Sequence, residues 1–92
     1  MPVTYVHIEW PGAEKDQVYS PSSVIQNYFK PEEELSITAF SKVCNEGLME
    51  ASERVRQKFG YACSSAQMES IRITEKCKSY QQEALVKILS IK

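Results

Sequence analysis

The chain has 92 residues, of which 42% are hydrophobic and 25% are charged, and its formal net charge is −1. This length and composition predict one small globular domain over residues 1–92. The near-neutral charge argues against partners that bind basic proteins, so we expect neither nucleic acid nor a membrane as a partner. No stretch of the sequence is long and apolar enough to span a bilayer.

The N-terminal sequence, MPVTYVHIEW, lacks the basic start and the continuous apolar core of a secretory signal. We therefore expect a cytoplasmic protein whose three cysteines, Cys44, Cys63 and Cys77, are free thiols. The chain has one histidine and no Cys-x-x-Cys pair, so we expect no metal ion and no cofactor.

The first structural element is a predicted β-hairpin. Residues 3–10 alternate in a strand pattern that places Val6, Ile8 and Trp10 on one face. A Pro-Gly turn follows at residues 11–12, and residues 15–19 form the returning strand.

A short helix is predicted over residues 21–29, with Ser20 as its N-cap and Pro21 in its first position. Pro31 ends it, and the acidic run at residues 32–34 follows. We interpret this run as a solvated loop, with docking of a basic partner as the alternative.

A long amphipathic helix is predicted over residues 37–59, capped by Ser36 or Thr38. Gly47 weakens this helix, and a close crossing with another element would explain its presence. Gly60 is placed to take a left-handed conformation just after the helix end. The buried stripe recurs at three- and four-residue steps and comprises Phe40, Val43, Cys44, Leu48, Ala51, Val55 and Phe59.

A third helix is predicted over residues 65–81, opened by a capping box of Ser64 and Gln67. The C-terminal residues 84–91 suit either a helix or a strand. We favour a strand because they are rich in β-branched residues and because a third strand would stabilise the hairpin. The predicted fold is thus α+β, an antiparallel sheet of hairpin and C-terminal strand packed against three helices.

Two residues are candidates for chemistry. Cys63 precedes a helix, where the helix dipole lowers a thiol pKa. The alternative is that its small neighbours mark a tight helix–helix corner, and we favour this packing role. His7 is the other candidate, but its strand position favours an exposed or half-buried sheet residue. Cys44 and Cys77 lie on apolar helix faces and are predicted to be buried.

The candidate binding residues are Arg54, Arg56, Tyr61 and Trp10. Arg54 and Arg56 lie two positions apart on a helix, so they do not share one narrow face. Their alternative role is ion pairing with nearby glutamates or solvation. For Trp10, packing in the core or on the sheet is favoured over a place in an interface.

Three landmarks recur in the same order in a known family. They are Trp10-Pro11, the Tyr-Ser-Pro-Ser segment at residues 19–22, and the ASERVRQKFGYACS corner at residues 51–64. With them the chain resembles a family of small bacterial nitrogen-starvation response proteins. The resemblance implies an association with gene clusters that encode a nitrilase and a radical-SAM protein, linked to nitrile or cyanide use. It implies no catalytic residue.

We therefore expect a non-catalytic cytoplasmic accessory or interaction protein in a nitrogen-limitation pathway. Its expected partner is a protein from such a gene cluster or a second copy of the chain. One alternative is a thiol-based redox sensor or another activity that depends on Cys63. The other is a small-ligand binding module with Arg54, Arg56 and Tyr61 near a pocket rim.

Overall fold

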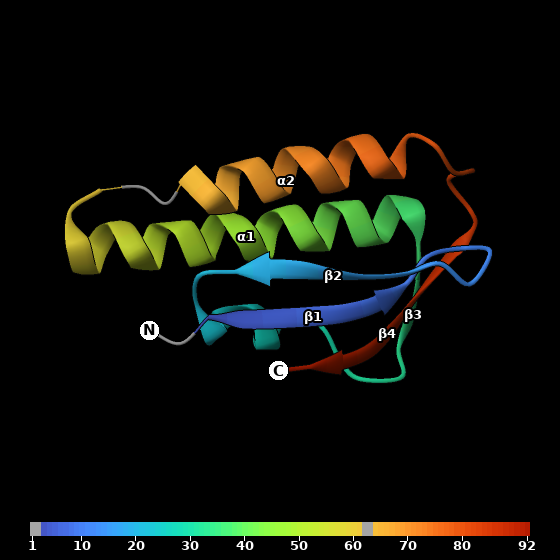
Figure 1. Ribbon diagram of the computed structural model, residues 1–92, viewed down its shortest axis with the longest axis horizontal. Helices are drawn as coiled ribbons and strands as arrows, with labels where there is room; N and C mark the ends of the chain where they lie inside the picture. The colour runs from blue at the N-terminus through green and yellow to red at the C-terminus, as the bar shows by residue number, and fades with distance from the viewer. Residues whose placement is uncertain (1–2, 62–63) are drawn as a thin grey trace.

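The computed structural model describes residues 3–61 and 64–92. In these residues an antiparallel sheet packs against two α-helices (Figure 1). The strands are β1 (Thr4–Glu9), β2 (Lys15–Ser20), β3 (Glu34–Ser36) and β4 (Leu85–Ile91). The helices are the 3-10 helix η1 (Ser23–Asn27) and the α-helices α1 (Ile37–Phe59) and α2 (Ser64–Cys77).

The strand order is β2-β1-β4-β3, and each neighbouring pair is antiparallel. The predicted hairpin is confirmed, with Val6 opposite Val18 in the β1–β2 register. Val6, Ile8 and Trp10 are at most 1% exposed, so the predicted inward face of β1 is also confirmed. The alternation of side chains leaves the opposite face of β1 half-buried.

The C-terminal segment forms the strand β4, which pairs with β1 on one side and with β3 on the other. The acidic run at residues 32–34 is not a loop throughout, because Glu34 opens β3 and lies opposite Lys87. Leu35 lies opposite the buried Val86, and this apolar contact holds β3 to the sheet. A strand of three residues is too short to show an alternating pattern in the sequence.

The helix predicted over residues 21–29 is not an α-helix. The described residues therefore contain two α-helices, whereas we expected three helices. A 3-10 helix, Ser23–Asn27, occupies that place, and its N-cap is Ser22 rather than Ser20. Ser20 ends β2, and its buried hydroxyl donates to the carbonyl oxygen of Ser22 at 2.7 Å. The helix therefore starts later, with only one short turn before Pro31, which suits the tighter 3-10 form.

Helix α1 begins and ends as predicted. The Ser36 hydroxyl accepts a hydrogen bond from the Ala39 N–H at 3.2 Å, so Ser36 rather than Thr38 is the cap. Gly60 has a φ of 84°, and its N–H donates to the Arg56 carbonyl oxygen at 2.8 Å. Its 23 residues make a rod of about 35 Å.

Helix α2 ends at Cys77, four residues before the predicted end. The N–H groups of Lys78, Ser79 and Tyr80 donate to carbonyl oxygens three residues back, so the chain tightens as it leaves the helix. The Ser64–Gln67 capping box is untested, because residues 62–63, which precede α2, lie outside the described residues.

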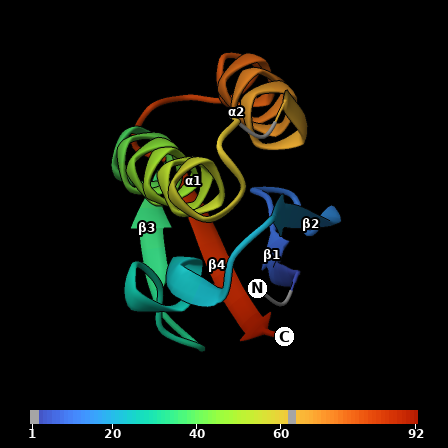
Figure 2. The ribbon, with the colours of Figure 1, turned by 90° about the vertical axis from the view of Figure 1, so that its left-hand side faces the viewer.

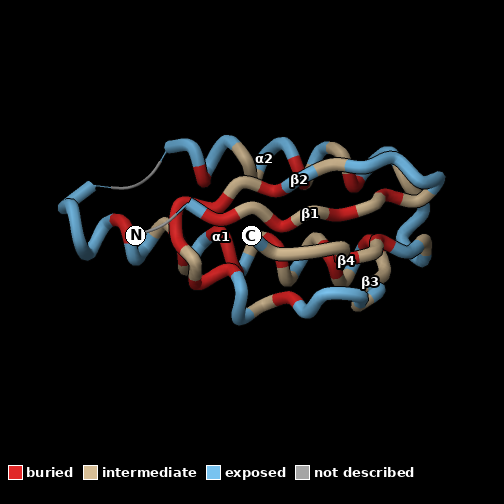
Figure 3. Tube along the Cα trace, turned by 60° about the horizontal axis from the view of Figure 1, so that its bottom comes forward, coloured by how far each residue is buried: buried red, intermediate tan, exposed pale blue. Residues whose placement is uncertain are grey.

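The two helices cover different parts of the sheet. In Figure 2, α1 lies over β4 and β3, whereas α2 lies beside α1 and next to β2. Buried residues follow the inner faces of these elements, as the red segments of Figure 3 show. Neither helix in the described part of the chain is long and apolar enough to cross a membrane.

Gly47 lies where α1 crosses η1 and the residue that follows it. A Cβ at this position would overlap Ile25 Cδ1 and come within 3.2 Å of the Tyr28 ring. The expected close crossing therefore exists, and the partner of α1 there is the 3-10 helix.

We predict that Gly47→Ala lowers the free energy of unfolding by about 1 kcal/mol. Alanine favours a helix by about 1 kcal/mol over glycine, but overpacking a core costs about 1–3 kcal/mol. Urea denaturation of the variant and the wild type measures the difference. Because Ile25 is fully buried, its side chain has little room to move. A variant more stable than the wild type would show that the Ile25 side chain does move aside and would contradict the prediction.

Candidate functional site

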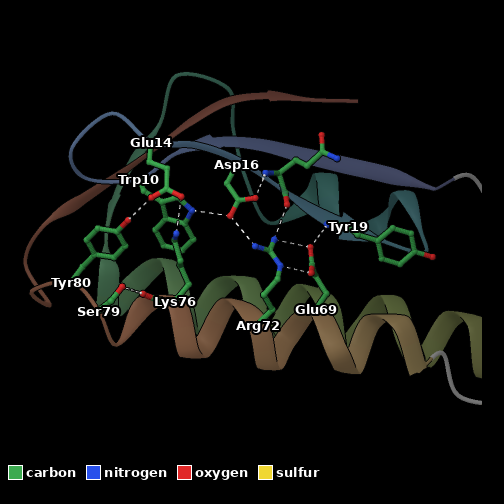
Figure 4. A network of polar contacts seen from close by, with 10 residues as sticks. Trp10, Glu14, Asp16, Tyr19, Glu69, Arg72, Lys76, Ser79 and Tyr80 are labelled. Carbon is green, nitrogen blue, oxygen red and sulfur yellow. Dashed lines mark hydrogen bonds and ion pairs between the residues drawn. The ribbon is translucent and has the colours of Figure 1, made fainter.

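A network of polar side chains fastens α2 to the free edge of β2 (Figure 4). The Arg72 Nη2 donates to the carbonyl oxygen of Gln17 at 2.9 Å. The Glu69 carboxylate accepts from the N–H of Tyr19 at 2.7 Å. In an antiparallel pair these two backbone groups point away from β1. Two side chains of α2 thus satisfy the edge that an additional strand would otherwise occupy.

Asp16 lies at the centre of this network. Its Oδ2 accepts from Arg72 Nη1 and from Trp10 Nε1, each at 2.9 Å. Burial would raise the pKa of Asp16, but the hydrogen bonds from Arg72, Trp10 and the Gln17 N–H outweigh burial and lower it. Hydrogen bonds to Glu69 and Asp16 in turn raise the pKa of Arg72. The ionised pair is therefore the stable form of this contact.

A second group of contacts extends the network along α2. The Lys76 Nζ lies 2.7 Å from the Glu14 carboxylate, and the Tyr80 hydroxyl donates to the same carboxylate at 3.3 Å. The Tyr80 ring stacks on Trp10 at a centroid distance of 5.4 Å and an angle of 10°. These groups bind one another, so the network acts as a support that fixes α2 against the hairpin.

The second feature is an open groove of about 580 Å³ between α1 and α2. Its floor includes the buried residues Leu48 and Ala66, whereas Met49 and Ile71 are 73% and 64% exposed. The remaining lining residues are Asn45, Ser52, Glu53, Arg56, Gln67 and Ser70.

Polar contacts mark both ends of this groove along α1. Near one end, Asn45 joins the helices, because its side chain bonds to the hydroxyl groups of Ser70 and Thr74. At the other end, Glu53 and Arg56 form an ion pair within α1. Between these ends the apolar residues Leu48, Met49, Ala66 and Ile71 line the groove together with the uncharged Ser52 and Gln67.

The structure distributes the four predicted binding residues over separate places. Arg56 lines the groove, whereas Arg54 pairs with Glu50 at 3.1 Å and is not a lining residue. Tyr61 is 66% exposed, with its ring 6.3 Å from that of Phe59. Trp10 is buried in the core, as its favoured packing role predicts.

Of the two candidates for chemistry, only His7 lies among the described residues. His7 lies half-buried on the outer face of the sheet, with its ring 6.4 Å from that of Tyr5. Cys63 lies outside the described residues, so its reactivity stays a prediction. No group of three or more His, Cys, Asp or Glu residues within the described ranges is arranged to hold a metal ion.

Sequence reasoning missed both the network and the groove. Asp16 lies on the same face of β2 as the buried Val18. A carboxylate at such an inward position needs a polar partner, and this was the sequence feature that could have indicated the network. Phe59, which is predicted to end the buried stripe of the long helix, is 53% exposed, and Met68 and Ile71 on α2 are 70% and 64% exposed. An apolar residue can be recognised as exposed only when it is known which face of the helix is buried, and the sequence alone does not fix that face.

Cys44 and Cys77 are buried free thiols, as predicted. Burial raises the pKa of both, because a thiolate is poorly solvated in the core. Neither thiol is therefore suited to act as a nucleophile at neutral pH.

We predict that Asp16→Asn lowers the free energy of unfolding by about 1–2 kcal/mol at pH 7, because charge-assisted bonds to Arg72 and Trp10 weaken. The folded-state pKa of Asp16 is lowered, so its contribution is present above the unfolded pKa near 4 and is lost at lower pH. The wild type and the variant should therefore converge in stability between pH 4 and pH 2. Urea denaturation across that range measures the convergence.

Glu75→Gln is the matched control for this experiment. Glu75 lies on α2 like Arg72, and its substitution removes only an exposed ion pair with Lys78, the residue that follows the helix. No measurable change in stability is expected for it. A pH-independent gap between Asp16→Asn and the wild type would contradict the ionic role of Asp16.

We predict that the two buried thiols resist modification in the folded protein. In a Cys63→Ser variant, reaction with a thiol reagent at pH 8 should be at least about 100-fold slower than in urea, because each thiol must first be exposed by opening of the fold. Absorbance of the released chromophore follows the reaction. Rapid reaction of the folded variant would show that Cys44 or Cys77 is accessible.

Comparison with known proteins gives one match. No curated protein and no solved structure matches the chain. A family described as "Nitrogen starvation-induced protein NitG" matches residues 5–91, which is nearly the whole sequence and includes all three landmarks of the predicted resemblance. The chain belongs to this family of nitrogen starvation-induced proteins.

Proposed function

We propose that this protein is a non-catalytic accessory protein of the nitrogen-starvation response, and that it acts by binding a protein at the groove between α1 and α2. The observation that carries the proposal is where exposed apolar residues gather. Seven large hydrophobic residues are exposed in the described part of the chain, and five of them lie on α1, α2 or the segment between them. The five are Met49, Phe59, Tyr61, Met68 and Ile71.

Such a gathering is typical of an interaction surface, because exposing large apolar side chains to water is unfavourable unless another surface covers them. The two exposed methionines support this interpretation, since the flexible thioether side chain adapts to the shape of a partner. A groove between two helices with an apolar floor accepts one helix of a partner through residues spaced three and four apart.

The charges around the groove favour a protein over a charged ligand. Glu53 and Arg56 pair with each other, and Glu50 and Arg54 do the same one turn earlier. A free anion or a phosphate would have to compete with these carboxylates for the arginines. The small-ligand hypothesis for this corner stays a prediction, and the exposed Met49 and Ile71 beside the groove floor support protein binding more directly.

The resemblance noted from the sequence extends this proposal to a pathway. Its gene clusters encode a nitrilase and a radical-SAM protein, so the partner is sought among such products or in a second copy of the chain. A cytoplasmic location, expected because the N-terminal sequence lacks the pattern of a secretory signal, is part of the same proposal.

We predict that a photo-crosslinking amino acid at Met49 captures a protein in nitrogen-starved cells of the source organism. The exposed position leaves the fold intact, and its place at the groove puts the crosslinker beside a bound partner. Mass spectrometry identifies the captured chain. An added Ile71→Glu substitution should abolish capture, because a carboxylate would be buried in the apolar contact.

The control places the same crosslinker at Leu85, which is 52% exposed at the start of β4 and is not among the residues that line the groove. Capture that is equal at Met49 and Leu85, or that is unaffected by Ile71→Glu, would remove the groove from the proposal.

A further inference from the structure

We infer that α2 is a cover for the free edge of β2, and that it opens as a unit while the sheet, η1 and α1 stay folded. The inference goes beyond the proposed function, because opening is a property of the chain alone and requires no partner. Three observations carry it: the small share of α2 in the core, the way α2 is attached, and the point along the chain where that attachment ends.

Helix α2 contributes little to the core. Its buried residues are Ala66, Ile73 and Cys77, whereas α1 has seven buried residues. In the described residues, the main core cluster contains Ile73 and Cys77 from α2, and its other members come from the strands, η1, α1 and residues that flank them. Hydrophobic stabilisation follows the apolar area that is buried, so most of it remains when α2 opens.

Polar contacts attach α2 on both of its sides. Toward the sheet, Glu69 and Arg72 bond to backbone groups of β2, and toward α1, the Asn45 side chain bonds to two hydroxyl groups of α2. The Arg72 side chain is 43% exposed, and solvated ionic contacts stabilise a fold less than buried apolar contacts do. Because each of these contacts involves a side chain, β2 keeps its backbone pairing with β1 when they break.

The opening unit has a defined C-terminal limit. After α2 the chain returns to the start of α1, where the Ile37 N–H donates to the Ala84 carbonyl oxygen at 2.9 Å and the Thr38 N–H donates to that of Gln82 at 3.3 Å. The Thr38 hydroxyl also donates to the Gln82 side chain at 2.7 Å. The opening therefore ends before Gln82, and β4 stays in the sheet.

Opening changes what the edge of β2 presents to its surroundings. The Gln17 carbonyl oxygen and the Tyr19 N–H, which both point away from β1, are released from Arg72 and Glu69. An edge strand that presents such groups accepts the backbone of an added strand. In its closed position, α2 therefore blocks strand addition at β2.

Native-state hydrogen exchange of the full chain, followed by NMR, tests the inference because it reports the opening of each segment separately. The opening equilibrium constant of the interior amides of α2 should be at least about tenfold larger than that of the amides of β1 and β4. Two neighbouring amides of β2 give the sharpest comparison. The Tyr19 N–H bonds to α2 and should exchange together with it, whereas the Val18 N–H points toward β1 and should exchange with the sheet.

Two substitutions distinguish a separate unit from all-or-none unfolding. Ile88→Val in the buried core of β4 should speed exchange in β1 and β4 about fivefold and leave α2 unchanged, because residue 88 stays packed when α2 opens. Arg72→Gln should speed exchange in α2 and at Tyr19 about fivefold, because it weakens the attachment to β2. Glu75→Gln, which removes an exposed ion pair at the end of α2, should leave this exchange unchanged.

Circular dichroism confirms that each variant is folded. The inference is overturned by equal opening of α2 and β4 in the wild type, by equal acceleration of both in Ile88→Val, or by a Tyr19 amide that does not exchange together with α2. Such a failure leaves partner binding at the groove unaffected, because crosslinking at Met49 tests that binding separately.

Discussion

The placement of the other functional features depends on the contact of Arg72 and Glu69 with the backbone of β2. An exposed edge strand presents unpaired N–H and C=O groups and invites pairing with other chains. Here the Glu69 carboxylate accepts a hydrogen bond from one backbone N–H of β2, and the Arg72 guanidinium donates to one backbone carbonyl oxygen. The same contact holds α2 at a fixed distance from the sheet. It therefore protects the edge and positions the second wall of the groove.

The groove exists because α2 is held at the side of the sheet by polar contacts and does not lie flat across its face. Had both helices packed fully on the sheet, the apolar residues of α2 would face the core. Instead α2 buries a narrow stripe, Ala66, Ile73 and Cys77, and leaves Met68 and Ile71 in solvent. These exposed apolar side chains are the basis on which we propose a contact surface for a partner.

The family description names nitrogen starvation as the condition that induces such proteins. The structure adds a physical picture to that description. Its polar network is closed on itself, its described cysteines are buried, and its exposed apolar residues gather on the two helices. This combination favours a protein that works through association, with the sheet and the network as a rigid support for one helical face.

The sequence by itself determined the hairpin, the long helix with its Gly60 end, and the family, whereas the choice of Ser36 over Thr38 as the cap came from the structure. These features follow from local signals: alternation in the strands, three- and four-residue spacing in the helix, and residues with restricted backbone preferences. The 3-10 form of η1, the short strand β3 and the early end of α2 were decided by tertiary packing. The 3-10 helix and β3 are too short for a periodic pattern to show in the sequence, and the end of α2 depends on contacts with distant segments.

The candidate site was decided almost entirely by the tertiary structure. Arg56, a predicted binding residue, lines the groove, but the facing wall comes from a helix that begins eight residues later. Asp16 and Arg72 are 56 positions apart, so no local pattern joins them. The sequence specified which side chains each helix carries. Only the fixed position of α2 against β2 decided which of them face the core and which are exposed.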